Sequence, residues 1–173
     1  MARIKWTERR FDFNFPAGIY PEIIERLRGT PARLEDLFAR LPIETLINQA
    51  DGRWSMQENA GHLLDLERLV SQRIDEYLAG NTALHAADMS NRKTYEASHN
   101  EVPVSAVLKD FRTARHELVD RLEGFDADVF ERSALHPRLQ VPMRLVDMLF
   151  FQAEHDDYHL ARISELKRLL VNK

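Results

Sequence analysis

Three of the seven histidines have the spacing of metal ligands. His155 and His159 are four residues apart, and on a helix such residues lie one turn apart on the same side, so both imidazoles can reach one ion. Burying two charged imidazoles without a partner is costly, and a bound metal ion removes that cost. Residues on the same predicted helix face recur every three or four positions, and we expect this face to point into the core. Besides the two histidines, it carries Met148, Gln152, Ile163, Leu166 and Leu170.

His62 is the predicted third ligand. It lies on a different predicted helix, on the side that carries Leu66 and Leu69. Three neutral imidazoles with open coordination positions are typical of catalytic zinc sites and of sites for similar divalent cations. Such an ion can activate water for hydrolysis or hold a thiol sulfur for transfer to an electrophile. Spacing alone leaves open that His62 is a hydrogen-bonded core residue and that the other two histidines are not ligands.

Two better-known metal templates do not fit these residues. A zincin needs His-Glu-x-x-His, but Asp156 follows His155, and only 14 residues remain after His159 for a downstream ligand. A di-iron bundle needs two Glu-x-x-His pairs on facing helices, whereas the one such pair, Glu96 and His99, lies in a polar connection. The three-histidine site therefore remains the favoured interpretation.

Composition limits the class of protein. The 173 residues, 44% of them hydrophobic, suffice for a single domain over residues 1–173 with a real core. The formal net charge of −4 argues against binding to nucleic acid or to an anionic membrane. The absence of cysteine excludes a disulfide framework, an iron–sulfur cluster and a cysteine nucleophile. With no signal peptide and no membrane-length apolar run, we expect a cytoplasmic protein that acts on a small molecule.

The apolar periodicity predicts helices and no array of strands. Ser55 and Glu58 form the Ser-x-x-Glu pattern of a capping box, which marks a helix start. The first 15 residues alternate aromatic and polar side chains and are expected as short extended pieces or as an arm over the bundle. The fold class is therefore all-α, an up-and-down four-helix bundle with a long crossover connection. The expected helices are 19–41 with a break at Gly29, 55–79, 104–123 and 142–170, and the long connections are 82–102 and 125–141.

The order of these motifs resembles the DinB-like (YfiT-like) superfamily over essentially the whole chain. The resemblance implies a four-helix bundle, often dimeric, in which His62, His155 and His159 bind one divalent metal ion per chain, commonly zinc or nickel. Relatives include thiol-dependent S-transferases and metal-dependent hydrolases, so we expect one of these activities; the alternative is a non-catalytic metal- or ligand-binding protein associated with stress. The resemblance rests on Trp54-Ser55-(x)2-Glu58-(x)3-His62-Leu63, His155-(x)3-His159, Arg26-Leu27-(x)2-Thr30-Pro31 and His136-Pro137-Arg138-Leu139.

Residues around the predicted site have a structural and a functional interpretation. Glu58 is a candidate base or outer ligand partner, although the capping box already explains it. Asp156 and Asp157 are candidates to orient an imidazole, and Tyr158 is a candidate acid or substrate contact. The structural interpretation is favoured for the rest: surface positions for His85, His99 and His136, a solvated face rather than an anion site for Arg92, Arg112 and Arg115, and packing for Trp6 and Trp54.

Assembly is predicted from one pair of aromatic residues. Phe150 and Phe151 are adjacent, so both side chains cannot point into the same core. We expect one of them to face a second copy of the chain in a two-fold symmetric homodimer.

Overall fold

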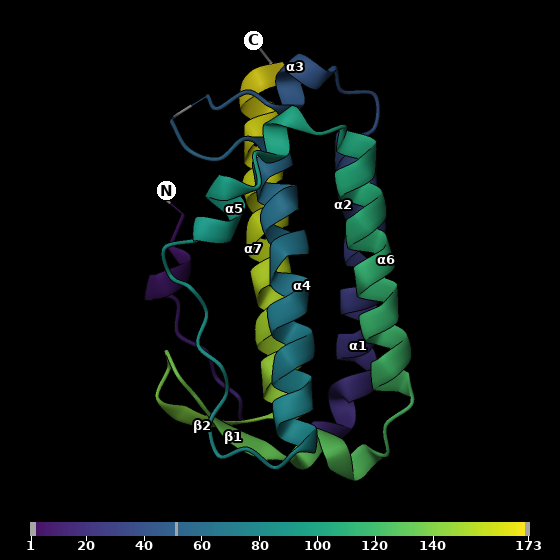
Figure 1. The fold of residues 1–173 in the computed structure, drawn as a ribbon, viewed down its shortest axis with the longest axis vertical. Coiled ribbons are helices and arrows are strands. Elements are labelled where there is room, and N and C mark those ends of the chain that lie inside the picture. The colour runs from purple at the N-terminus through teal and green to yellow at the C-terminus, as the bar shows by residue number, and fades with distance from the viewer. Residues whose placement is uncertain (1–2, 51, 172–173) are drawn as a thin grey trace.

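Four long helical segments form the body of the molecule, as predicted (Figure 1). The computed structural model describes residues 3–50 and 52–171. The first segment consists of two helices, α1 (Tyr20–Arg28) and α2 (Thr30–Phe38). The others are the single helices α4 (Met56–Leu78), α6 (Val104–Glu123) and α7 (Leu145–Val171). The short elements are η1 (Trp6–Glu8), η2 (Ala17–Ile19), α3 (Ile43–Leu46), α5 (Arg92–Glu96), η3 (His99–Glu101), η4 (Ala127–Glu131), β1 (Ser133–His136) and β2 (Val141–Arg144).

The long connection after α4 determines the topology. It returns along the length of the bundle before α6 begins, so α4 and α6 run in the same direction (Figure 1). This connection contains α5 and η3, both of which contact α4, and Thr94 of α5 lies at hydrogen-bond distance from His62. In the described part of the chain, no helix is long and apolar enough to cross a membrane.

The start of α4 confirms the capping box. The Ser55 side chain accepts a hydrogen bond from the Glu58 backbone N–H at 3.0 Å, and the Glu58 carboxylate accepts one from the Ser55 N–H at 2.7 Å. Gln49 also donates to the Glu58 carboxylate at 2.8 Å. Two otherwise unpaired backbone donors are satisfied in this way, which fixes the register of the helix that carries His62.

The prediction that the last helix starts at Pro142 was wrong. Residues Val141–Arg144 form a strand paired antiparallel with Ser133–His136, and α7 begins at Leu145. The Asp147 carboxylate, at the third position of the helix, accepts a hydrogen bond from the Arg144 N–H at 2.8 Å, as the third residue does in a capping box. Gln140 turns the chain with a positive φ of 55° between the two strands. This hairpin lies at the lower end of the bundle (Figure 1), and its residues include His136 and Arg138.

The N-terminal segment is an arm that packs over α7. Trp6 and Phe11 both contact Phe151, with ring centroids 4.9 Å apart in each case. Phe15 covers Phe150 at 5.2 Å. The predicted arm is therefore confirmed, and it packs on both Phe150 and Phe151, one of which was expected to face a second copy. The homodimer stays a prediction, without the argument from this pair.

A buried ion-pair network crosses the centre of the bundle. Arg115 of α6 is fully buried and binds Glu67 of α4 at 2.6 Å and Asp156 of α7 at 2.5 Å. Asp156 also accepts a hydrogen bond from Thr30 of α2 at 2.9 Å. The prediction of a solvated face for Arg115 was wrong. Arg112 is partly exposed, in line with the prediction, and it pairs there with Glu35. The network ties four helices together one residue away from His155.

Candidate metal centre

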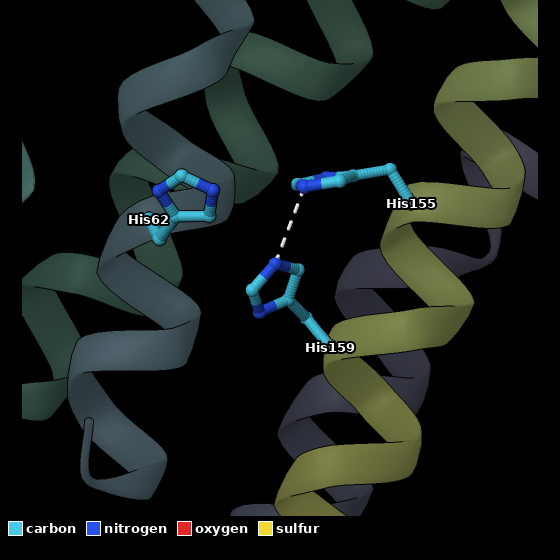
Figure 2. A group of neighbouring side chains, drawn as sticks. All are labelled: His62, His155 and His159. Carbon is cyan, nitrogen blue, oxygen red and sulfur yellow. Dashed lines mark hydrogen bonds between the residues drawn. The ribbon is translucent and has the colours of Figure 1, made fainter. Parts of the chain in front are cut away.

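Three buried imidazoles meet between α4 and α7 (Figure 2). His62 approaches from α4, and His155 and His159 approach from successive turns of α7. The Nε2 atoms of His155 and His159 are 3.2 Å apart, and the three candidate ligand nitrogens all lie within 4.8 Å of one another. The structure thus brings together the three residues that the sequence singled out.

A hydrogen-bond chain orients His62. Its Nδ1 lies 3.0 Å from the Thr94 hydroxyl, and Thr94 in turn bonds the Asp65 carboxylate. Burial alone would raise the pKa of Asp65, but hydrogen bonds from His99 and Thr94 outweigh burial and lower it, so Asp65 is an ionised acceptor. Thr94 therefore donates to Asp65 and accepts from His62 Nδ1, which leaves the Nε2 lone pair of His62 free to bind an ion.

His99 completes this hydrogen-bond chain and packs closely against α4. Its Nε2 lies 2.9 Å from Asp65, and its ring lies directly against Gly61. A Cβ at position 61 would be 2.2 Å from that ring, so only glycine allows the approach. The expectation that His99 is a surface residue was wrong, since its side chain is buried.

Asn59 orients His159 in the same way as Thr94 orients His62, through a hydrogen bond to Nδ1. The Asn59 amide nitrogen donates to the backbone carbonyls of Trp54 at 3.2 Å and Ser55 at 2.7 Å, which fixes its oxygen on the opposite side. That oxygen accepts from His159 Nδ1 at 2.8 Å. The Nε2 lone pair of His159 is therefore also free. Metal-binding histidines are commonly held by such a hydrogen bond to the second ring nitrogen.

All three imidazoles are held neutral. Burial, helped by the nearby His155, lowers the pKa of His62 to about 3, and burial with the charges of Arg138 and Arg115 lowers the pKa of His155 to about 3. Burial, with the neighbouring His155 and His62, also lowers the pKa of His159. Neutral imidazole is the form that binds a metal ion.

The donor set fits a divalent transition-metal ion. Two nitrogens that bind zinc at ~2.0–2.1 Å in a tetrahedral site lie roughly 3.3 Å apart. The 3.2 Å between His155 and His159 matches this spacing. Nδ1 of His155 is buried and has no hydrogen-bond partner in the described residues, while the Trp6 ring packs edge-on against the imidazole at 4.9 Å.

The centre lies in the wall of a cavity of about 670 Å³. Both tryptophans of the chain line it: Trp54 packs on His62 at 4.7 Å, and Trp6 packs on His155. Tyr158 also lines it, with its ring edge-on to His159. Both tryptophans were expected to serve packing alone, and their place at the site was not predicted. Trp54 comes just before the predicted helix that carries His62, and this position could have indicated its place at the site. Nothing in the sequence indicated the place of Trp6.

The other candidate residues have different surroundings. Asp156 binds Arg115 and Thr30 rather than an imidazole, and Asp157 pairs with Arg26 and Arg33. Glu58 keeps its capping role, and its catalytic role stays a prediction. His85 is exposed as expected. His136 was expected at the surface, but it is 2% exposed and lines the cavity.

The lowered pKa values predict how the metal-free protein responds to acid. The ordinary histidine value is 6.5, so between about pH 6.5 and the folded values near 3 the unfolded chain binds more protons at His62 and His155. The free energy of unfolding should therefore fall on acidification through this range, by up to about 1.4 kcal/mol per pH unit for each such histidine. Urea unfolding of chelator-treated protein at several pH values measures this slope.

A matched pair of variants separates this effect from general acid sensitivity. His62→Gln should flatten the slope, and His85→Gln, at an exposed position, should leave it unchanged. A stability that does not change between pH 6.5 and 4.5 would contradict buried neutral histidines.

The fold and the site together define a helical-bundle protein with a three-histidine cluster that could hold a metal ion. Residues 26–163 match the family described as the DinB superfamily, and the chain belongs to that superfamily. It is 24% identical over 164 residues, 88% of this chain and 93% of the other, to a protein of Bacillus pumilus (strain SAFR-032) named "Putative metal-dependent hydrolase".

A solved structure has the same fold. It is that of YfiT from Bacillus subtilis, described as a probable metal-dependent hydrolase with an unusual four-helix bundle topology. The two chains are 21% identical, the match covers 92% of each, and the TM-score is 0.79. The predicted superfamily and bundle architecture are thereby confirmed.

Proposed function

We propose that this protein is a divalent-metal-dependent enzyme that hydrolyses a small molecule in the cavity beside His62, His155 and His159. The observation that carries the proposal is the convergence of three neutral imidazoles, two of them with Nδ1 already engaged, on one point of the cavity wall. The names of the relatives in Bacillus pumilus and Bacillus subtilis support the same class of activity. Zinc and nickel are the proposed ions, because imidazole nitrogen suits both.

The residues of the chain have separate roles in this proposal. A divalent ion held by the three histidines would supply a Lewis acid that activates a nucleophile near neutral pH. Thr94 and Asn59 hold the rings of His62 and His159 in the ligand orientation. Trp6 and Trp54 close the apolar sides of the cavity and reduce the access of water to the histidines.

Thiol transfer is the second candidate, and one observation favours it. Asp88 is the one carboxylate among the described residues that line the cavity, and its oxygens already accept from Ser90 and from the Arg92 N–H. No carboxylate is thus free to act as a base beside the histidines in that set. A low-molecular-weight thiol held as thiolate needs no such base, because it is itself the nucleophile.

One substrate screen separates the candidates. Protein reconstituted with zinc, nickel or manganese is offered ester, amide and lactone substrates, with and without a small thiol, and electrophiles with the same thiol. We expect hydrolysis without thiol and inhibition when thiol is added. Consumption of an electrophile only when metal and thiol are both present would establish the transferase instead. No turnover in any arm would leave a non-catalytic binding protein.

A further inference from the structure

A second polar cluster lines the same cavity and takes no part in the metal centre. It consists of Arg73 from α4 and of His136 and Arg138 from the β1–β2 hairpin. These three residues line the cavity together with the predicted ligand His155. Burial lowers the pKa of His136, Arg73 and His155, and the positive charge of Arg138 lowers it further. The cluster was not predicted from sequence, because the hairpin itself was not.

His136 lines the cavity and has an unpaired ring N–H. The Leu139 backbone N–H donates to His136 Nδ1 at 3.1 Å, so the proton of the neutral ring is on Nε2. Burial, followed by the charges of Arg73 and Arg138, lowers the pKa of His136 to about 4, which keeps the ring neutral at pH 7. The side chain is 2% exposed, and Nε2 has no acceptor in the described part of the chain.

Arg138 presents a second unpaired donor. Its guanidinium lies 5.8 Å from the Trp6 ring centroid and 5.4 Å from that of Phe151, and its Nη2 is buried without an acceptor in the described residues. Burial lowers the pKa of Arg138, with no carboxylate opposing that shift. Arg115, the fully buried arginine of the bundle, instead has two carboxylate partners. The Arg138 side chain as a whole is only partly buried, and its Nη2 is the buried atom that lacks such an acceptor.

Apart from Asp88, the charged side chains among the described lining residues are all arginines. Arg73 is 5% exposed and uses two of its nitrogens on the His85 carbonyl, at 3.0 and 2.9 Å, which compensates none of its charge. Asp88 is again the one carboxylate among the described lining residues, and it is already engaged. The arginines that line the cavity are Arg3, Arg53, Arg73, Arg138 and Arg162.

We propose that His136 and Arg138 form an anion-binding subsite that holds a carboxylate of the substrate while its reactive end lies at the three histidines. Two N–H donors without acceptors, on one hairpin and in the lining of a cavity that contains five arginines, complement the planar oxygens of a carboxylate. The substrate class is then a small carboxylic acid with a second, metal-directed functional group. This inference rests on the proposed function for the position of the reactive end, but not for the anion subsite itself.

The test uses probes that differ only in charge. The probes are hydroxamic acids, which are uncharged when free near neutral pH and chelate metal ions through two oxygens. Each is joined by one, two or three methylene groups either to a carboxylate or to the matching amide. Both tryptophans line the cavity, so quenching of intrinsic fluorescence reports binding to zinc-loaded and to metal-free protein. The variants are Arg138→Gln and His136→Leu, and the control is Arg132→Gln, an exposed arginine just before β1.

We expect at least one carboxylate to bind the zinc-loaded protein about tenfold or more tightly than its amide. Arg138→Gln should remove this preference without changing zinc content or amide affinity, and Arg132→Gln should keep it. His136→Leu should reduce it while circular dichroism shows a folded chain. Equal binding of carboxylates and amides at every length, or an undiminished preference in Arg138→Gln, would overturn the subsite.

Failure of the metal centre gives a different result. If the protein binds no zinc, the proposed function fails, but the metal-free protein should still prefer carboxylates, and Arg138→Gln should still remove that preference. If zinc binds and the carboxylate and amide probes bind with equal affinity, the metal centre stands and the anion subsite fails.

Discussion

Replacing His155 with alanine is expected to weaken zinc binding by more than about a hundredfold and to abolish metal-dependent turnover. The residue supplies one of three nitrogens that lie within 4.8 Å of one another, and its Nε2 is 3.2 Å from that of His159. Loss of a direct ligand should exceed the ~10–100-fold loss typical of outer partners. Competition with a chromogenic chelator measures the zinc affinity, and elemental analysis gives the content.

Two further variants make this result specific. Thr94→Val keeps the shape of the side chain but removes the acceptor of His62 Nδ1, so a loss of roughly 10–100-fold is expected. His85→Gln, at an exposed position, should bind zinc as the unchanged protein does. Equal affinities for all three variants would show that zinc binds elsewhere.

Replacing Arg115 with methionine is expected to lower the free energy of unfolding by about 3–5 kcal/mol. The arginine is fully buried between Glu67 and Asp156, and burial opposes its charge, but the two carboxylates outweigh burial and raise its pKa. Methionine fills much of the volume but leaves two carboxylates in the core without a cation. Urea denaturation followed by circular dichroism measures the change.

Neighbouring substitutions distinguish this network from an ordinary surface ion pair. Arg112→Met lies one turn earlier on α6 and breaks a half-exposed pair with Glu35, which should cost no more than about 1 kcal/mol. Adding Glu67→Gln and Asp156→Asn to Arg115→Met should restore much of the lost stability, because the buried charges are gone. A small effect of Arg115→Met alone would contradict the claim that this variant leaves two charged carboxylates unpaired in the core.

The helices and the three histidines could be predicted because helix periodicity is a local property of the sequence. His155 and His159 share a face by their spacing, and His62 lies on the apolar side of a helix whose capping box marks its start. The break at Gly29 and the crossover connection follow from similar local signals.

The partners of these histidines could not be predicted in the same way. Thr94 and His99 lie in a connection without periodicity, and they meet α4 only because the chain returns along the bundle. Arg115 resembles a surface arginine in sequence, and its burial depends on carboxylates 48 and 41 residues away. The hairpin that carries His136 was hidden because its strands have only four residues each.

Anomalous diffraction from crystals of the zinc-loaded protein tests the central claim most directly. We predict one strong anomalous peak per chain at the zinc edge, within about 2.0–2.1 Å of one nitrogen from each of His62, His155 and His159. A peak at any other group of residues, or no peak after reconstitution with zinc and with nickel, would contradict the assignment of these three histidines as the metal centre.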